Sequence, residues 1–99
     1  MITDIKNYTD AIVPILARYG VVKAAFFGSF VNGQFREGKS DMDILVLPPR
    51  GMSLLDFIGL KQDIEDTIRI DVDLVSYNGI SPYLKDSILS KEQVFYETR

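Results

Sequence analysis

Residues 26–48, FFGSFVNGQFREGKSDMDILVLP, constrain the fold of this chain more than any other segment. A hydrophobic run ends at Gly28 and Ser29, a polar segment with further glycines follows, and Asp41 and Asp43 open a second hydrophobic run. Short apolar runs bounded by glycine and polar residues are typical of buried strands. The segment therefore predicts two strands joined by a polar loop, with a Gly-Ser turn after the first strand and an acidic pair opening the second.

The turn and the acidic pair suit phosphate and metal chemistry. Adjacent glycine and serine residues can offer backbone N–H groups and a hydroxyl to a phosphate. Asp41 and Asp43 are two residues apart, so on a strand they point to the same face, roughly 6.6 Å apart along it. That spacing suits Mg²⁺, which takes oxygen ligands. A phosphate cradle facing a metal-binding acidic pair is typical of phosphoryl or nucleotidyl transfer.

The surroundings of the acidic pair strengthen the metal interpretation. An isolated Asp-x-Asp is common, and carboxylates at a strand start are often simply solvated or cap a turn. Here both side chains share a face with Leu45 and Leu47, which places them at the mouth of a buried layer. Desolvating a carboxylate there is costly unless a cation or hydrogen bonds compensate.

A second acidic pair, Asp71 and Asp73, lies on another predicted strand. If that strand lies beside residues 42–47, one of its carboxylates joins Asp41 and Asp43. Three converging carboxylates make a two-metal site, or a metal site with a base. The spacing alone does not say which of the two residues converges.

Composition narrows the chemistry that the chain can perform. With 99 residues we expect one domain spanning residues 1–99. A net charge of −3 argues against a general nucleic-acid binder, but not against a nucleotide, because a bound metal can supply positive charge. The chain has no cysteine or histidine, which excludes disulfides, thiolate zinc sites and histidine-based catalysis. No signal-peptide pattern or long apolar run is present, so we expect a cytoplasmic protein with no membrane contact.

Hydrophobic periodicity predicts three helices and four strands along the chain. In the helix over residues 4–19 we expect a kink or a restart at Pro14. Ser53 starts a second helix in a capping-box pattern, and Ser81 with Pro82 starts a third. The five tyrosines are interpreted as core or interface packing residues. The second helix spans residues 54–69, and the strands span residues 21–27, 42–47, 70–76 and 94–96. This order predicts the α/β (α+β) class, with a small mixed sheet and helices packed on it.

Taken together, residues 24–76 resemble a minimal nucleotidyltransferase, the MNT group of the DNA polymerase β-like superfamily. The matching strings are AAFFGSFVNG, SDMDILV and VDLV. In that family a strand ends in Gly-Ser, Asp-x-Asp starts the next strand, and a later strand supplies a third carboxylate. The resemblance implies catalytic and metal-binding roles for Asp41, Asp43 and Asp73, and it prefers Asp73 over Asp71 because VDLV is the matching string.

The resemblance also implies a set of nucleotide-binding residues around the triphosphate. Many relatives have Ala-Arg-Gly where this chain has Val-Asn-Gly, so Asn32 replaces a positive contact that Arg36 or Lys39 can supply instead. The loop from Ser29 to Asp41 is one residue longer than the common form. The implied nucleotide-binding residues are Gly28, Ser29, Asn32, Arg36, Lys39 and Ser40.

Members of this group often pair with a HEPN-domain protein as a toxin–antitoxin system. The resemblance therefore implies an enzyme that uses two Mg²⁺ ions and ATP to transfer AMP to a tyrosine of a HEPN ribonuclease toxin, within a hetero-oligomer. Two alternatives stay open at this point. One is a non-catalytic antitoxin that acts by binding alone. The other is a nucleotidyltransferase subunit that acts on a small molecule such as an aminoglycoside.

Overall fold

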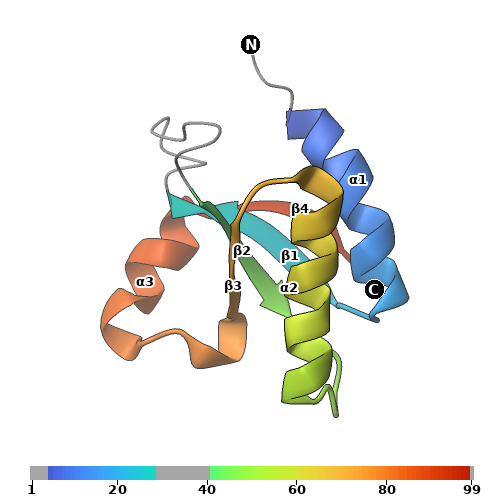
Figure 1. Cartoon of the computed structure of the whole chain (residues 1–99). Coiled ribbons are helices and arrows are strands. Elements are labelled where there is room, and N and C mark those ends of the chain that lie inside the picture. Colours follow the sequence, from blue (N-terminus) through green and yellow to red (C-terminus); the bar gives the residue numbers. More distant parts are fainter. Residues whose placement is uncertain (1–4, 29–40, 99) are drawn as a thin grey trace.

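The computed structural model describes residues 5–28 and 41–98 of the chain. These residues form a four-stranded sheet with three α-helices and a short 3₁₀ helix (Figure 1). The predicted α/β class and the predicted element order are therefore confirmed. The elements are α1 (Ile5–Arg18), β1 (Lys23–Phe27), β2 (Met42–Leu47), α2 (Leu54–Ile68), β3 (Val72–Ser76), η2 (Tyr77–Gly79), α3 (Pro82–Lys91) and β4 (Gln93–Glu97).

The sheet is mixed, with the strand order β3-β2-β1-β4. Strand β1 pairs antiparallel with both β2 and β4, whereas β2 pairs parallel with β3 through the crossover helix α2. Helices α1 and α2 lie together on one side of the sheet and α3 lies on the other (Figure 1). The predicted edge strand near the C-terminus is confirmed as β4.

The main core lies between the sheet and the pair α1 and α2. Alternation along β2 turns Met42, Ile44 and Val46 to this face, where all three are fully buried. The opposite face also carries buried residues, since Leu45 and Ala25 have no exposed surface. Both faces of the central strands are therefore covered. The helix residues in this core include Ile12 and Leu16 of α1 and Leu60 and Ile64 of α2.

Most helix ends lie where the sequence predicts them. The Ser53 hydroxyl accepts a hydrogen bond from the backbone N–H of Asp56 at 3.1 Å, and Ser81 caps α3 with Pro82 at its first position. Helix α1 runs through Pro14 as one element, so the chain does not restart there, and the alternative of a kink at Pro14 stays a prediction. Buried residues on both sides of this exposed proline, Ile12 and Ile15 among them, hold the two parts of the helix against the core.

Two strands begin two residues later than predicted. The prediction began them at residues 21 and 70, whereas β1 begins at Lys23 and β3 at Val72. Val21 and Ile70 are nevertheless buried in the core, 1% and 8% exposed. A buried apolar residue just before a strand continues the apolar pattern and so extends the predicted strand. Among the described residues, no helix has the length and apolar character needed to cross a membrane.

Candidate functional site

Asp43 and Asp73 lie side by side on neighbouring strands. In the parallel pairing of β2 with β3, Asp43 is the direct partner of Asp73, and in the antiparallel pairing with β1 it is the partner of Phe27. Paired residues on adjacent strands point to the same face, and the strands themselves are about 4.8 Å apart. Asp43 is half-buried and Asp73 is exposed. Two carboxylates thus face the same side at the end of the sheet where β2 and β3 begin.

The other two acidic residues flank this pair. Asp41 is exposed, directly precedes β2 and falls on the face of Asp43 by the alternation of the strand. The carbonyl of Asp71 accepts a hydrogen bond from the Met42 N–H at 2.9 Å, one residue before β3 begins. The register therefore brings Asp73 directly beside Asp43, and Asp71 lies one step further toward the start of both strands.

Gly28 makes room for the Asp43 carboxylate. Its φ is +68°, in the left-handed region, and a Cβ added to it would lie 2.1 Å from Oδ2 of Asp43. The carboxylate therefore occupies the space that any other side chain at position 28 would need. The sequence pattern assigned Gly28 to phosphate binding. Only the folded structure shows that Gly28 also leaves space for the Asp43 side chain.

The carboxylate oxygens of the predicted site are the type of ligand that a hard cation takes. Carboxylate oxygens from β2 and β3 share one side of the sheet, and none of the ion pairs among the described residues involves Asp41 or Asp73. Within residues 5–28 and 41–98, no three Asp, Glu, His or Cys side chains gather closely enough to form a metal centre. The assignment of Asp41, Asp43 and Asp73 as Mg²⁺ ligands stays a prediction.

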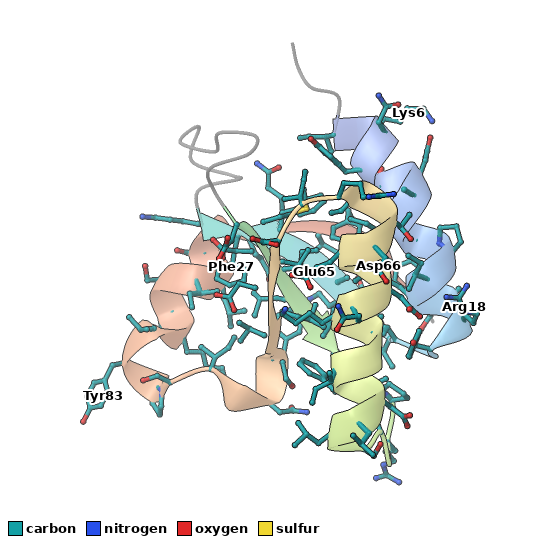
Figure 2. All side chains as sticks on the ribbon, viewed as in Figure 1. Lys6, Arg18, Phe27, Glu65, Asp66 and Tyr83 are labelled. Atoms are coloured by element: carbon teal, nitrogen blue, oxygen red, sulfur yellow. The ribbon has the colours of Figure 1, made fainter. Side chains whose placement is uncertain are left out.

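The loop half of the predicted site lies outside the described residues. Of the predicted nucleotide-binding residues only Gly28 is described, at the end of β1. Phe27, next to it, and Glu65 of α2 lie at the same end of the sheet (Figure 2). The predicted roles of the others therefore stay predictions; they are Ser29, Asn32, Arg36, Lys39 and Ser40.

A cluster that the sequence did not indicate holds α3 over the sheet. The Tyr77 hydroxyl donates a hydrogen bond to Glu92, the residue that follows α3. The Lys23 ammonium group lies 5.2 Å from the centre of the Tyr77 ring. Burial, followed by the Glu92 contact, raises the pKa of Tyr77 well above its usual range. We expected tyrosines to pack, but no spacing in the sequence indicates that residues 15 apart form this bond.

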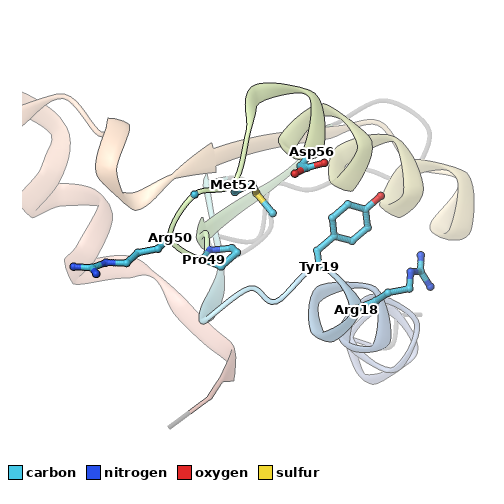
Figure 3. A pocket seen from close by; sticks show the side chains of 7 residues that line it. Arg18, Tyr19, Pro49, Arg50, Met52 and Asp56 are labelled. Atoms are coloured by element: carbon cyan, nitrogen blue, oxygen red, sulfur yellow. The ribbon is translucent and has the colours of Figure 1, made fainter.

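A separate pocket lies at the opposite end of β2. It has a volume of about 360 Å³, and Arg18, Tyr19, Arg50 and Asp56 are among its lining residues (Figure 3). The Tyr19 hydroxyl reaches toward α2 and donates to Asp63 at 2.6 Å, which raises the pKa of Tyr19. Its lining includes the residues just after β2 ends, whereas Asp43 lies near the strand's start. The pocket is therefore distinct from the acidic site.

Asp43 and Asp73 are paired on neighbouring strands and Gly28 lies against Asp43, as the resemblance to nucleotidyltransferases implies; the catalytic roles of these residues stay predictions. Comparison with known proteins identifies the family. Residues 10–99 match the family model described as polymerase beta, nucleotidyltransferase, so the chain belongs to this family. The match covers nearly the whole chain. The chain is thus a nucleotidyltransferase, and the fold predicted from the sequence is confirmed.

Two relatives and two solved structures illustrate the similarity. A candidate protein adenylyltransferase of Methanocaldococcus jannaschii is 45% identical over 88 residues, which span 89% of this chain and 94% of the relative. Protein adenylyltransferase MntA of Thermococcus cleftensis is 38% identical over 72 residues, 73% of this chain and 72% of the relative.

The structural matches are of the same type. A solved candidate minimal nucleotidyltransferase has a TM-score of 0.77 and 34% identity, over 88% of each chain. A complex of a tri-AMPylated HEPN toxin with an MNT antitoxin from Shewanella oneidensis has a TM-score of 0.71 and 21% identity, over 94% of this chain and 72% of the matched chain. At that identity the second match shows a shared fold alone.

Proposed function

We propose that this chain transfers AMP from ATP to a tyrosine of a HEPN ribonuclease toxin and thereby acts as its antitoxin. The observation that carries the proposal is the pairing of Asp43 with Asp73 beside the Gly28 turn. The names of the relatives, protein adenylyltransferases, support the reaction. The likeness in fold to an MNT antitoxin that is in complex with an AMPylated HEPN toxin supports the acceptor.

In this proposal, carboxylates and backbone groups divide the work of positioning. Asp41 and Asp43 would hold two Mg²⁺ ions, and Asp73 would complete one of the two metal sites. Bound there, the ions would supply charge neutralisation for the α-phosphate and the departing pyrophosphate. The backbone after Gly28, the Ser29 hydroxyl and the polar loop residues hold the β- and γ-phosphates. Catalysis is then mostly positioning and charge neutralisation.

The chemical step forms one P–O bond, breaks another and transfers one proton. The acceptor tyrosine oxygen forms a bond to the α-phosphorus, while the bond from that phosphorus to the oxygen bridging to the β-phosphate breaks. Pyrophosphate leaves with the electron pair of the broken bond. Asp73 takes the proton of the tyrosine hydroxyl and passes it to solvent, to which its side chain is exposed.

A protein acceptor also suits the surface of the chain. In this proposal the partner in a hetero-oligomer supplies the acceptor side of the site. The described residues leave apolar side chains exposed, among them Leu54 and Leu55 of α2 and Tyr83 of α3, at 75%, 81% and 95%. AMP on the toxin adds negative charge, which opposes binding of RNA phosphates.

Intact-mass spectrometry tests this function. The chain is incubated with Mg²⁺, ATP and a HEPN-type helical protein, and we expect the partner's mass to rise by one or more AMP units on a tyrosine. The double variant Asp41→Asn with Asp43→Asn should transfer no AMP yet keep its fold, because the buried apolar residues of β2 are unchanged. Silencing of the partner without a mass change would favour binding alone. Label from ATP on an aminoglycoside would favour a small-molecule acceptor.

A further inference from the structure

Glu65, near the end of α2, reaches the first residue of β3. Its Oε2 accepts a hydrogen bond from the Val72 backbone N–H at 2.7 Å and another from Nζ of Lys61 at 3.1 Å. The Glu65 side chain is only 17% exposed, so water competes weakly for these contacts. A carboxylate that accepts from a backbone N–H forms one of the stronger hydrogen bonds in proteins. The Glu65 side chain therefore links α2 to Val72 of β3, seven residues further along the chain.

The Val72 N–H is a group that the sheet does not use. Among residues 5–28 and 41–98, β3 is at the edge of the sheet and has β2 as its only neighbour. Met42, the partner of Val72, donates its N–H to the carbonyl of Asp71. In a parallel pair this pattern turns the backbone groups of residues 71 and 73 toward β2, and it turns the Val72 N–H away from β2. Glu65 satisfies this outward donor.

The turn between α2 and β3 is held by the backbone of the same residue. Arg69 adopts a left-handed conformation with φ of 60°, and its N–H donates to the carbonyl of Glu65 at 2.8 Å. Glu65 therefore holds both the first residue of the turn and the residue at which β3 begins. A shift of β3 by one residue would move every side chain of the strand to the opposite face. Asp73, one residue after the anchored Val72, would then leave Asp43.

We propose that Glu65 is a positioning residue of the candidate site, which sets the start of β3 and so keeps Asp73 beside Asp43. The role of Asp73 in catalysis rests on the proposed function, whereas the role of Glu65 in placing it does not. Glu65 acts through the backbone of Val72 and touches neither nucleotide nor acceptor.

Three single variants separate the contacts of Glu65. Glu65→Leu removes the acceptor and keeps a side chain of similar size, whereas Glu65→Gln keeps an oxygen that can accept from Val72. Lys61→Met is the matched control, because it removes the ion pair and leaves the Val72 bond. Each variant is measured for amide hydrogen exchange of Val72 by NMR, for Mn²⁺ affinity as a probe of the carboxylates, and for AMP transfer.

We expect Glu65→Leu to speed exchange of the Val72 amide by about 10-fold or more, as for loss of a hydrogen bond to a charged group. Mn²⁺ affinity and kcat should each fall by about 10-fold, as they do when supporting contacts of a metal site are lost. Glu65→Gln and Lys61→Met should stay within about 3-fold of the wild type, because each keeps an oxygen that accepts from the Val72 N–H.

Unchanged Val72 exchange and Mn²⁺ affinity in a folded Glu65→Leu protein would overturn the proposal, as would equal losses in Lys61→Met. If the wild type binds Mn²⁺ but transfers no AMP, the proposed function fails, and the Val72 exchange and Mn²⁺ data still decide the role of Glu65. If Glu65→Leu does not fold, Glu65→Met takes its place in the same measurements: Val72 exchange faster than in Lys61→Met supports the proposal, and exchange equal to that in Lys61→Met contradicts it.

Discussion

At the scale of single residues, the closest constraint is between Gly28 and Asp43. We predict that Gly28→Ala abolishes most AMP transfer, because a Cβ 2.1 Å from Oδ2 must displace the carboxylate. Gly51→Ala is the matched control, since its φ is +81° but nothing lies within 4 Å of the added Cβ. Both changes should cost about 1 kcal/mol in unfolding free energy from backbone strain. Urea unfolding and transfer assays check this, and equal activity of the two variants would contradict it.

Asp71 and Asp73 can be ranked by how much each contributes to AMP transfer. Asp73→Asn should reduce transfer by about 10²-fold or more, the usual loss for a metal ligand or general base. Asp71→Asn should have a far smaller effect, because Asp71 contributes a backbone carbonyl to the Met42 N–H and asparagine keeps that group. Initial rates at saturating ATP decide between them. A larger loss in Asp71→Asn than in Asp73→Asn would mean that Asp71, two residues earlier, is the third carboxylate of the site.

At the scale of elements, the joint between α2 and β3 should depend on pH. Partial burial acts to raise the pKa of Glu65, but the Val72 N–H and Lys61 lower it more, so the pKa lies below the ordinary value of 4.5. A carboxyl with a lowered pKa stabilises the fold above its ordinary pKa, and this contribution is lost as pH falls through the lowered value. The stability advantage of the wild type over Glu65→Gln should therefore be present near neutral pH and shrink below pH 4.5. Unfolding free energies of both proteins across pH test this, and a constant difference would contradict it.

The attachment of α3 is a second property of an element. None of the residues of α3 is buried, so the helix depends on contacts at its ends, and the hydrogen bond from Tyr77 to Glu92, the residue that follows α3, is one of these. We predict that Tyr77→Phe speeds amide exchange across α3 and costs about 1 kcal/mol of stability. Tyr83→Phe is the control, because that side chain is 95% exposed and its hydroxyl has no hydrogen bond among the described residues. Equal exchange in the two variants would show that α3 is held in another way.

The sequence predicted these elements better than it predicted how they meet. Periodicity predicted β2 and α2 to within one residue of their observed ends, because both have a regular apolar pattern and α2 also has a clear N-cap. The pairing of β2 with β3 stayed conditional, since a parallel pair depends on the length of the crossover helix and on its final turn. Asp71 and Asp73 share a face, so spacing could not separate them. The Glu65 contact that fixes β3 links a side chain to a backbone group, and no residue pattern signals it.

At the scale of the whole molecule, nucleotide binding should stabilise a small domain measurably. A ligand present at about 10 times its Kd adds about 1.4 kcal/mol to the unfolding free energy. For a chain of this size, that corresponds to a rise in Tm of about 6–11 °C. We therefore expect Mg²⁺ with ATP to raise the Tm of the purified chain, and ATP with a chelator to raise it much less. The comparison needs no partner, so it tests nucleotide binding separately from the acceptor.

The ligand-induced rise in Tm of the double variant Asp41→Asn with Asp43→Asn tests whether the nucleotide binds at the acidic site. Without ligand, its Tm should equal or exceed that of the wild type, because two like charges on one strand face are removed and the buried residues of β2 are unchanged. With Mg²⁺ and ATP, its Tm should not rise. An equal rise in both proteins would place the nucleotide elsewhere, and the pocket lined by Arg18 and Arg50 is the first alternative. Arg50→Ala would then remove the shift, whereas at the acidic site it should leave the shift intact.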